Sequence, residues 1–318
     1  MRLITSTAFL FLILSVPLVS AEPPPQNSPV RPEVPAGTRV YPDVSYVAGG
    51  HALQKLDLYL PEQGENLPLI IWIHGGAWRS GGKEQLQASQ LLDFLADGYA
   101  IASVDYRLSQ HATFPAQIQD CKAAVRWLRA HAERYGLDPD RFGAWGPSAG
   151  GHLVALLGTA GDVGEFETGE NLNYSSRVQA VADFFGPTDF LQMDAHRLPE
   201  GLVHGLPDSP EARLVGGPIE LNRDKVAKAN PITYVSEDDP PFLIVHGDSD
   251  PLVPHHQSEL LADALRKADV PVVFYTVKGG RHGGFSDPKV GQLVKDFFAE
   301  HLKPDGFLDE ILKLFHWG

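Results

Sequence analysis

The spacing of apolar residues changes along the chain and predicts two kinds of strand. In residues 40–47 and 53–60, apolar and polar positions alternate. A period of two is typical of half-buried antiparallel strands, and Gly49-Gly50 between the two segments favours a hairpin turn. The next runs, residues 69–73 and 100–104, are apolar almost throughout, as in strands that are buried on both faces.

Helical periodicity separates the later apolar runs. Residues 115–134 carry apolar side chains at the spacing of one helix face, and Gly136 follows as a stop. Other helices are predicted at residues 83–96 and 258–268 and around Val290, Leu293, Val294, Phe297 and Phe298. Further strands are predicted at residues 141–145, 178–185, 242–245 and 272–275. This alternation predicts one α/β domain, residues 37–303, with about eight strands in a mostly parallel sheet, helices on both faces and right-handed crossovers.

The alternation lapses in residues 189–230, which are rich in proline, glycine and charged residues. This insertion follows a predicted strand and therefore begins at the carboxyl edge of the sheet, where open α/β sheets bind their ligands. We interpret it as a small, partly helical cap over the site. The alternative is a surface excursion that lies far from the chemistry.

The first 21 residues predict an export signal. Arg2 precedes an apolar run, and Val19-Ser20-Ala21 has small residues where a signal peptidase cuts. We expect cleavage near Ala21 and a secreted or periplasmic chain. The alternative, an uncleaved anchor, is disfavoured because polar residues and Pro17 interrupt the run. The proline-rich residues 22–36 predict a linker, and residues 304–318 predict a short amphipathic helix.

Composition narrows the classes of partner. The chain has 26 Lys and Arg against 40 Asp and Glu, a formal net charge of −14. This charge disfavours nucleic acid, or an anionic membrane for the mature chain, as a partner. Cys121 is the single cysteine, so an internal disulfide is impossible; its helical register places it in the core. A chain of 318 residues can bury a large core without one. The oligomeric state stays open.

The candidate chemistry centres on one serine. A predicted strand ends at Trp145, and Gly146-Pro147-Ser148-Ala149-Gly150-Gly151 leads into an apolar helix. G-x-S-x-G between a strand and a helix is the pattern of a nucleophile elbow, a tight turn that lifts the serine oxygen clear of the sheet. Glycine and serine are common in turns, so the hypothesis also requires a base, an acid and an oxyanion hole.

Later loops supply the base and the acid. A serine hydroxyl needs a base to accept its proton, and His282 lies in a glycine-rich loop just after a predicted strand. The base needs a carboxylate that fixes its tautomer. Asp248 and Asp250 both follow the strand that ends near His246. We favour Asp250, which is farther along the loop, and expect Asp248 to hold the turn by backbone hydrogen bonds.

The loop after residues 69–73 is the candidate oxyanion hole. Backbone N–H groups of Gly76 and Ala77, together with that of Ala149, are expected to converge on one oxygen, and Gly75 remains an alternative donor. We expect His74 to hydrogen-bond this loop into shape. Trp78 is either packing or a wall of the substrate pocket; the two are about equally favoured.

Taken together, the motifs resemble those of the α/β-hydrolase carboxylesterases. They are HGGAW (residues 74–78), DYRL (105–108), GPSAGG (146–151), HGDSDPLVP (246–254) and RHGG (281–284). The sequence is similar to the bacterial feruloyl/acetyl-xylan esterase and hormone-sensitive-lipase-like groups. The resemblance implies ester hydrolysis through an acyl-enzyme without metal or organic cofactor. Two departures are Ala77, where hormone-sensitive-lipase relatives carry glycine, and Pro147 before the serine.

Other features carry weaker signals. Residues 161–173 include four acidic side chains, but their spacing matches no EF-hand, so a solvated loop is favoured over a calcium site. His255-His256 lacks partners at metal-ligand spacing. Tyr106 and Arg107 are expected to tie loops together. We therefore expect neither a metal nor an organic cofactor.

These residues predict a serine carboxylesterase that acts on a small-molecule or polymer-linked ester, with a short acyl group or a carbohydrate alcohol. Ser148 attacks, His282 transfers the proton and Asp250 orients His282. One alternative is amide hydrolysis by the same triad, as in an aryl formamidase or a peptidase. Another is a catalytically silent binding module, which the presence of all three residues disfavours. The sequence leaves acyl length and alcohol group open.

Overall fold

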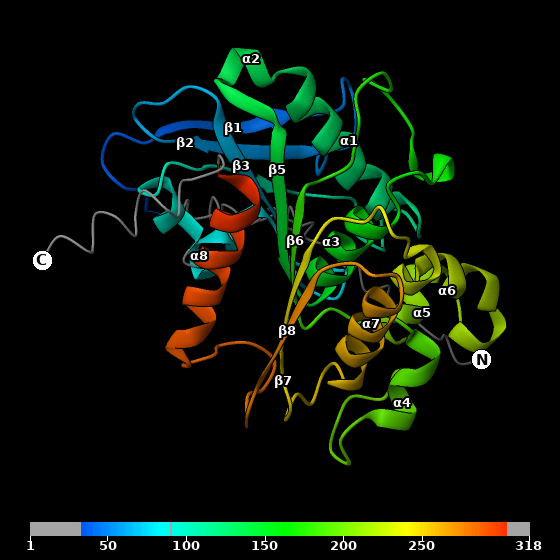
Figure 1. Cartoon of the computed structure of the whole chain (residues 1–318). Coiled ribbons are helices and arrows are strands. Elements are labelled where there is room, and N and C mark those ends of the chain that lie inside the picture. The colour runs from blue at the N-terminus through cyan, green and yellow to red at the C-terminus, as the bar shows by residue number, and fades with distance from the viewer. Residues whose placement is uncertain (1–32, 90, 304–318) are drawn as a thin grey trace, which may run out of the picture. The chain divides into compact units, whose positions relative to one another are not determined.

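A computed structural model describes residues 33–89 and 91–303 of the chain. The predicted export signal (1–21), most of the predicted linker (22–36) and the predicted C-terminal helix (304–318) lie outside these residues. Within them, one eight-stranded sheet has the strand order β1-β2-β4-β3-β5-β6-β7-β8 (Figure 1). The strands are β1 (Arg39–Ser45), β2 (Lys55–Leu60), β3 (Leu67–Ile73), β4 (Ala100–Val104), β5 (Leu137–Pro147), β6 (Ala180–Phe184), β7 (Phe242–Gly247) and β8 (Val272–Val277).

The sheet is antiparallel at one edge and parallel elsewhere. β2 pairs antiparallel with both β1 and β4, while every pair from β4–β3 to β7–β8 is parallel. The antiparallel edge agrees with the alternating runs, but β2 is buried at five of its six residues and is not half-buried as predicted. Its Asp57 is buried because Lys83 pairs with it at 2.8 Å. Because the carboxyl ends of parallel strands share an edge, the loops after β3, β5, β7 and β8 meet there.

Helices cover both faces of the sheet (Figure 1). The described α-helices are α1 (Ala116–Ala130), α2 (Ala132–Tyr135), α3 (Ala149–Thr159), α4 (Met193–His196), α5 (Pro210–Val215), α6 (Arg223–Ala229), α7 (His256–Lys267) and α8 (Pro288–Leu302). Gly136 ends α2 in the left-handed conformation, at φ 69°. Side chains of α1, α3 and α7 belong to one apolar cluster and those of α8 to another.

The two clusters explain why the central strands are apolar throughout. On β3, Ile71 and Ile73 point into the cluster with α1 and α3, whereas Ile70 and Trp72 point into the cluster with α8. A strand with core on both faces has no polar side to display.

The helical stretch predicted at residues 83–96 is present as 3₁₀ helix and not as α-helix. Its described residues form η1 (Lys83–Ser89) and η2 (Leu91–Leu95). Four of the five residues of η2 are buried, a wider apolar surface than one face of an α-helix offers. Burial of these side chains against α8 therefore sets the backbone here.

The predicted cap segment, residues 189–230, lies between β6 and β7 and contains α4, α5 and α6 together with short 3₁₀ turns. Its Leu202 N–H donates to the Pro251 carbonyl oxygen at 2.8 Å, so part of it lies against the loop after β7. That it covers the site stays a prediction. Within residues 33–89 and 91–303, no helix has the length and apolar character needed to span a membrane.

Candidate active site

The turn between β5 and α3 has the backbone of a nucleophile elbow. Ser148 at its apex has φ 56° and ψ −122°, which non-glycine residues rarely adopt. A Cβ at Gly146 would lie 2.6 Å from the Gly150 backbone, and one at Gly150 would lie 2.1 Å from the Ile73 carbonyl oxygen. Only glycine permits this approach. The Ser148 N–H donates to the Phe184 carbonyl oxygen at 2.8 Å, so β6 holds the apex.

The loop after β7 presents a buried carboxylate to a histidine. Asp250 Oδ2 lies 2.7 Å from His282 Nδ1 and 3.2 Å from His246 Nε2. Its Oδ1 accepts the N–H groups of Leu252 at 2.7 Å and Val253 at 3.0 Å. Burial opposes ionisation, but hydrogen bonds from the two histidines outweigh it and hold the pKa of Asp250 well below its usual range. Asp250 is therefore an anion at neutral pH.

The ionised Asp250 determines which nitrogen of His282 is free to act. A carboxylate accepts only, so His282 Nδ1 carries a proton and Nε2 keeps a lone pair. The imidazole packs against Phe185 with ring centroids 4.6 Å apart. Phe185 follows the residue that accepts the Ser148 N–H. The elbow and the histidine thus meet beside the end of β6.

Asp248 has a different partner from the one we predicted. Its Oδ1 accepts the N–H of Gly279, at 2.7 Å, in the loop that carries His282. Next to it, the Ser249 N–H donates to the Gly280 carbonyl oxygen at 3.0 Å. Asp248 therefore joins two loops and does not hold only its own turn.

The loop after β3 reaches the serine. A Cβ at Gly75 would lie 3.5 Å from Ser148 Cβ and 3.0 Å from the Pro147 carbonyl oxygen. Gly76, Ala77 and Trp78 follow with φ of 106°, 54° and 54°. Ala149 is the first residue of α3, and the N–H groups of a helix's first turn lack partners inside the helix. The structure therefore brings Gly75 of the predicted oxyanion loop close to Ser148, which Ala149 follows directly in the chain.

Buried side chains hold the loop after β3. His74 Nδ1 lies 2.7 Å from the Gly75 carbonyl oxygen, and its ring stacks on Tyr106 at 4.3 Å. Burial lowers the pKa of His74 to about 4, so the ring is neutral and donates from Nδ1. The Tyr106 hydroxyl donates to the His74 carbonyl oxygen at 3.0 Å, and Arg107 bonds Asp120. His74 and Tyr106 thus hold the loop after β3, as expected from the sequence, whereas Arg107 joins its loop to helix α1.

Trp78 is a packing residue. Its side chain is 1% exposed, its indole N–H donates to His152 Nδ1 at 3.2 Å, and its ring contacts Phe190. This burial is inconsistent with the alternative in which Trp78 forms an open wall of the substrate pocket.

A known family model matches most of this chain. Residues 56–265 match the model of the BD-FAE family. This chain belongs to the BD-FAE family. The matched segment includes the predicted oxyanion loop, the elbow and Asp250, and it ends before His282.

Members of several esterase groups resemble this BD-FAE chain. A probable carboxylic ester hydrolase of Mycobacterium tuberculosis, LipM, is 35% identical over 268 residues, 81% of this chain and 60% of LipM. The chain spans 60% of the length of LipM, 65% of that of the M. tuberculosis esterase LipQ and 53% of that of the M. tuberculosis esterase LipC.

Solved structures extend the likeness. A truncated carbohydrate esterase from gut microbiota is 37% identical with a TM-score of 0.75, covering 82% of this chain and 95% of that one. Thermogutta terrifontis esterase 2, phosphoramylated by tabun, is 27% identical with a TM-score of 0.65, covering 86% and 98%. These neighbours and the sheet topology confirm the predicted α/β-hydrolase fold.

Sequence reasoning missed His246 as a member of the site. It is fully buried on β7, with Nδ1 2.7 Å from Ser258 Oγ and Nε2 within 3.0 Å of the Val253 carbonyl oxygen. The same Nε2 faces Asp250, so the Asp250 carboxylate contacts two histidines, His246 and His282. A histidine at the end of a fully apolar strand was the available signal.

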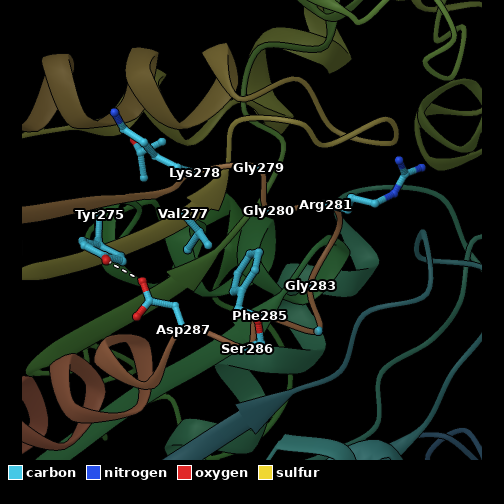
Figure 2. Close-up of a pocket in the computed structure, with 12 residues that line it drawn as sticks. Tyr275, Val277, Lys278, Gly279, Gly280, Arg281, Gly283, Phe285, Ser286 and Asp287 are labelled. Carbon is cyan, nitrogen blue, oxygen red and sulfur yellow. Dashed lines mark hydrogen bonds between the residues drawn. The ribbon is translucent and has the colours of Figure 1, made fainter.

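Sequence reasoning also missed a cavity behind the histidine loop. It measures about 450 Å³ and is lined by residues of one continuous segment, Tyr275 to Asp287. Figure 2 shows Tyr275 and Asp287 joined by a hydrogen bond, which is 2.6 Å long. His282 is absent from the lining because its ring faces Asp250.

Three of the four acidic side chains in residues 161–173 pair with cations, among them Asp162 with Arg177. Glu167 bonds both Lys122 and Arg126, which α1 holds buried, and Glu165 bonds Lys228. These carboxylates anchor their loop to the domain. Among the described residues, no three His, Cys, Asp or Glu side chains gather as metal ligands would.

Proposed function

We propose that this chain is a serine carboxylesterase in which Ser148, His282 and Asp250 form the catalytic triad. The observation that carries the proposal is the 2.7 Å contact between Asp250 Oδ2 and His282 Nδ1, beside a serine held on an elbow with φ 56°. An ionised, buried acid, a histidine with a free Nε2 and a partly exposed serine are the parts that acyl transfer requires.

In this mechanism His282 Nε2 accepts the Ser148 proton as Oγ attacks the ester carbonyl carbon. The tetrahedral oxyanion is held by N–H groups of Gly76, Ala77 and Ala149. His282 then gives its proton to the departing alkoxide, which leaves as the alcohol. The acyl group stays on Ser148 as the acyl-enzyme. Water repeats the sequence, with His282 as base, and releases the acid and free Ser148.

The substrate we favour is an ester with a short acyl group or a carbohydrate alcohol, either as a small molecule or on a polymer. Support comes from the 37% identity to a carbohydrate esterase. Amide hydrolysis is the second candidate, because the same triad serves both reactions. Turnover of p-nitrophenyl esters from acetate upward, acetylated xylan, methyl ferulate, an aryl formamide and a peptide would rank them. We further propose that the mature chain is exported, as the sequence of residues 1–21 predicts.

The proposal is tested by Ser148→Ala. We expect p-nitrophenyl acetate hydrolysis to fall by at least about 10³-fold, because covalent catalysis is lost. An organophosphate should label the unchanged protein once, on Ser148, and leave the variant unlabelled. Ser175→Ala, an exposed serine on another loop, is the matched control. Wild-type turnover by the Ser148→Ala variant would exclude the mechanism.

A further inference from the structure

His152 makes two directional hydrogen bonds from the interior of the domain. It lies on α3 with 0% exposure. Its Nδ1 accepts the Trp78 indole N–H at 3.2 Å, and its Nε2 lies 2.6 Å from the Ala229 carbonyl oxygen at the end of α6. Because a carbonyl only accepts, the ring proton sits on Nε2. His152 therefore joins the loop after β3 to the insertion between β6 and β7.

The loop that His152 holds needs external support. Ala77 and Trp78 both have φ of 54°, although neither is glycine. Side-chain-bearing residues keep such conformations only where surrounding contacts fix them. The Trp78 carbonyl oxygen accepts the Ser109 N–H at 2.7 Å, and the Trp78 side chain contacts His152 and Phe190. Among these contacts, the bond to His152 is the directional one made by the side chain.

One helix thereby positions both halves of the proposed oxyanion hole. Ala149, at the start of α3, supplies its own N–H. One turn later, His152 fixes Trp78, whose backbone continues directly from Gly76 and Ala77. The His152–Trp78 bond thus links the two sets of proposed donors, and rates of acyl transfer are sensitive to small displacements of such donors.

We propose that His152 is a positioning residue for ester hydrolysis, which acts through the Trp78 indole to hold the loop amides where the oxyanion develops. This inference rests on the proposed function. It requires a neutral ring, since a protonated Nδ1 would direct an N–H at the indole N–H. Burial lowers the pKa of His152 to about 4, consistent with a neutral ring at physiological pH.

Two conservative substitutions separate the bonds of His152. His152→Asn keeps an acceptor near the position of Nδ1, so the Trp78 bond can persist while the Ala229 bond is lost. His152→Gln keeps a donor near Nε2 and loses the acceptor. We expect the Asn variant to retain kcat on p-nitrophenyl acetate within about threefold and the Gln variant to lose about 10- to 100-fold, with KM within twofold for both.

Trp78→Phe removes the donor and keeps most of the ring. We expect a loss in kcat like that of His152→Gln, and a double variant no worse than either single one, because both remove the same bond. Affinity for 2,2,2-trifluoroacetophenone, which forms a tetrahedral adduct with the serine, should weaken by the same factor as kcat/KM. Trp72→Phe is the matched control, since its buried indole N–H has no hydrogen-bond partner in the described chain.

Folding of each variant is checked by circular dichroism and thermal unfolding. If folded His152→Gln and Trp78→Phe keep kcat and trifluoroketone affinity within twofold of wild type, the proposal is wrong. Multiplicative losses in the double variant, or equal losses for Asn and Gln, would also overturn it. If His152→Gln does not fold, Trp78→Phe decides alone. Failure of Ser148→Ala to abolish turnover would instead remove the proposed function.

Discussion

Two loops meet at the candidate site and are held in opposite ways. The loop after β3 is fixed by buried side chains, among them His74, Trp78 and His152. The loop after β8 is largely exposed and rich in glycine. Its backbone forms hydrogen bonds with the backbone of the turn after β7 and with the Asp248 carboxylate.

The difference follows from what each loop contributes. In the proposed mechanism the first loop contributes backbone N–H groups. These cannot adjust independently of the chain, so the whole loop must be rigid. The second offers one side chain, His282, whose orientation is fixed separately by the hydrogen bond to Asp250. A side chain held by its own partner tolerates a less rigid backbone.

The largest expected effect comes from removing that partner. In Asp250→Asn, the amide NH2 group can donate to His282 Nδ1. The ring proton then moves to Nε2, which no longer holds a free lone pair. We expect kcat on p-nitrophenyl acetate to fall by about 10³- to 10⁴-fold. Steady-state kinetics at pH 7 to 9 measures this. The control is Asp248→Asn, which keeps an acceptor for Gly279 and should remain near wild type.

Acid should weaken both loops through buried histidines with lowered pKa values, His152 beside the first loop and His246 beside the second. Burial lowers the folded-state pKa of His152 from 6.5 to about 4, so its contribution to stability is present above pH 6.5 and lost as pH falls toward 4; the loss is about 3 kcal/mol. Asp250 also has a depressed pKa, but its contribution persists down to about pH 4, the ordinary range of a carboxyl. Burial lowers the pKa of His74 and raises that of Asp105, so their effects on the free energy of unfolding in acid have opposite signs and largely offset each other.

Urea unfolding of wild type and His152→Asn between pH 7 and 4 measures the part of this acid sensitivity that comes from His152. We expect the free energy of unfolding of wild type to decline more steeply than that of the variant. Parallel declines would show that His152 does not account for acid sensitivity.

A smaller effect is expected for Asp248→Ala, which removes the acceptor for the Gly279 N–H. The histidine loop would be held by fewer bonds, so we expect kcat to fall about 3- to 10-fold with little change in KM. Hydrogen exchange at the Gly279 amide should accelerate, while exchange in the loop after β3 should not. Equal acceleration in both loops would mean that they are not held independently.

The sequence predicted the fold better than the support of the site. Eight strands follow from apolar runs and alternation, and the elbow, Asp250 and His282 follow from motifs beside strand ends. The partners of Asp248, Trp78 and His152 depend on segments 31 to 77 positions away. Local periodicity contains no record of such distant contacts, and for η2 tertiary burial overrode the helical pattern.

The close approach at the elbow has a consequence for how this chain can diversify. A methyl group at Gly150 would collide with the Ile73 carbonyl oxygen, and one at Gly151 would lie 2.3 Å from Asp183 Oδ1. We therefore expect almost no substitution to be tolerated at Gly150 and Gly151, beside the proposed nucleophile. Leu202, Leu206 and Leu252, each at least 40% exposed on the insertion and the neighbouring loop, carry no such constraint. Libraries that seek new activities would keep most of their folded members by varying these positions.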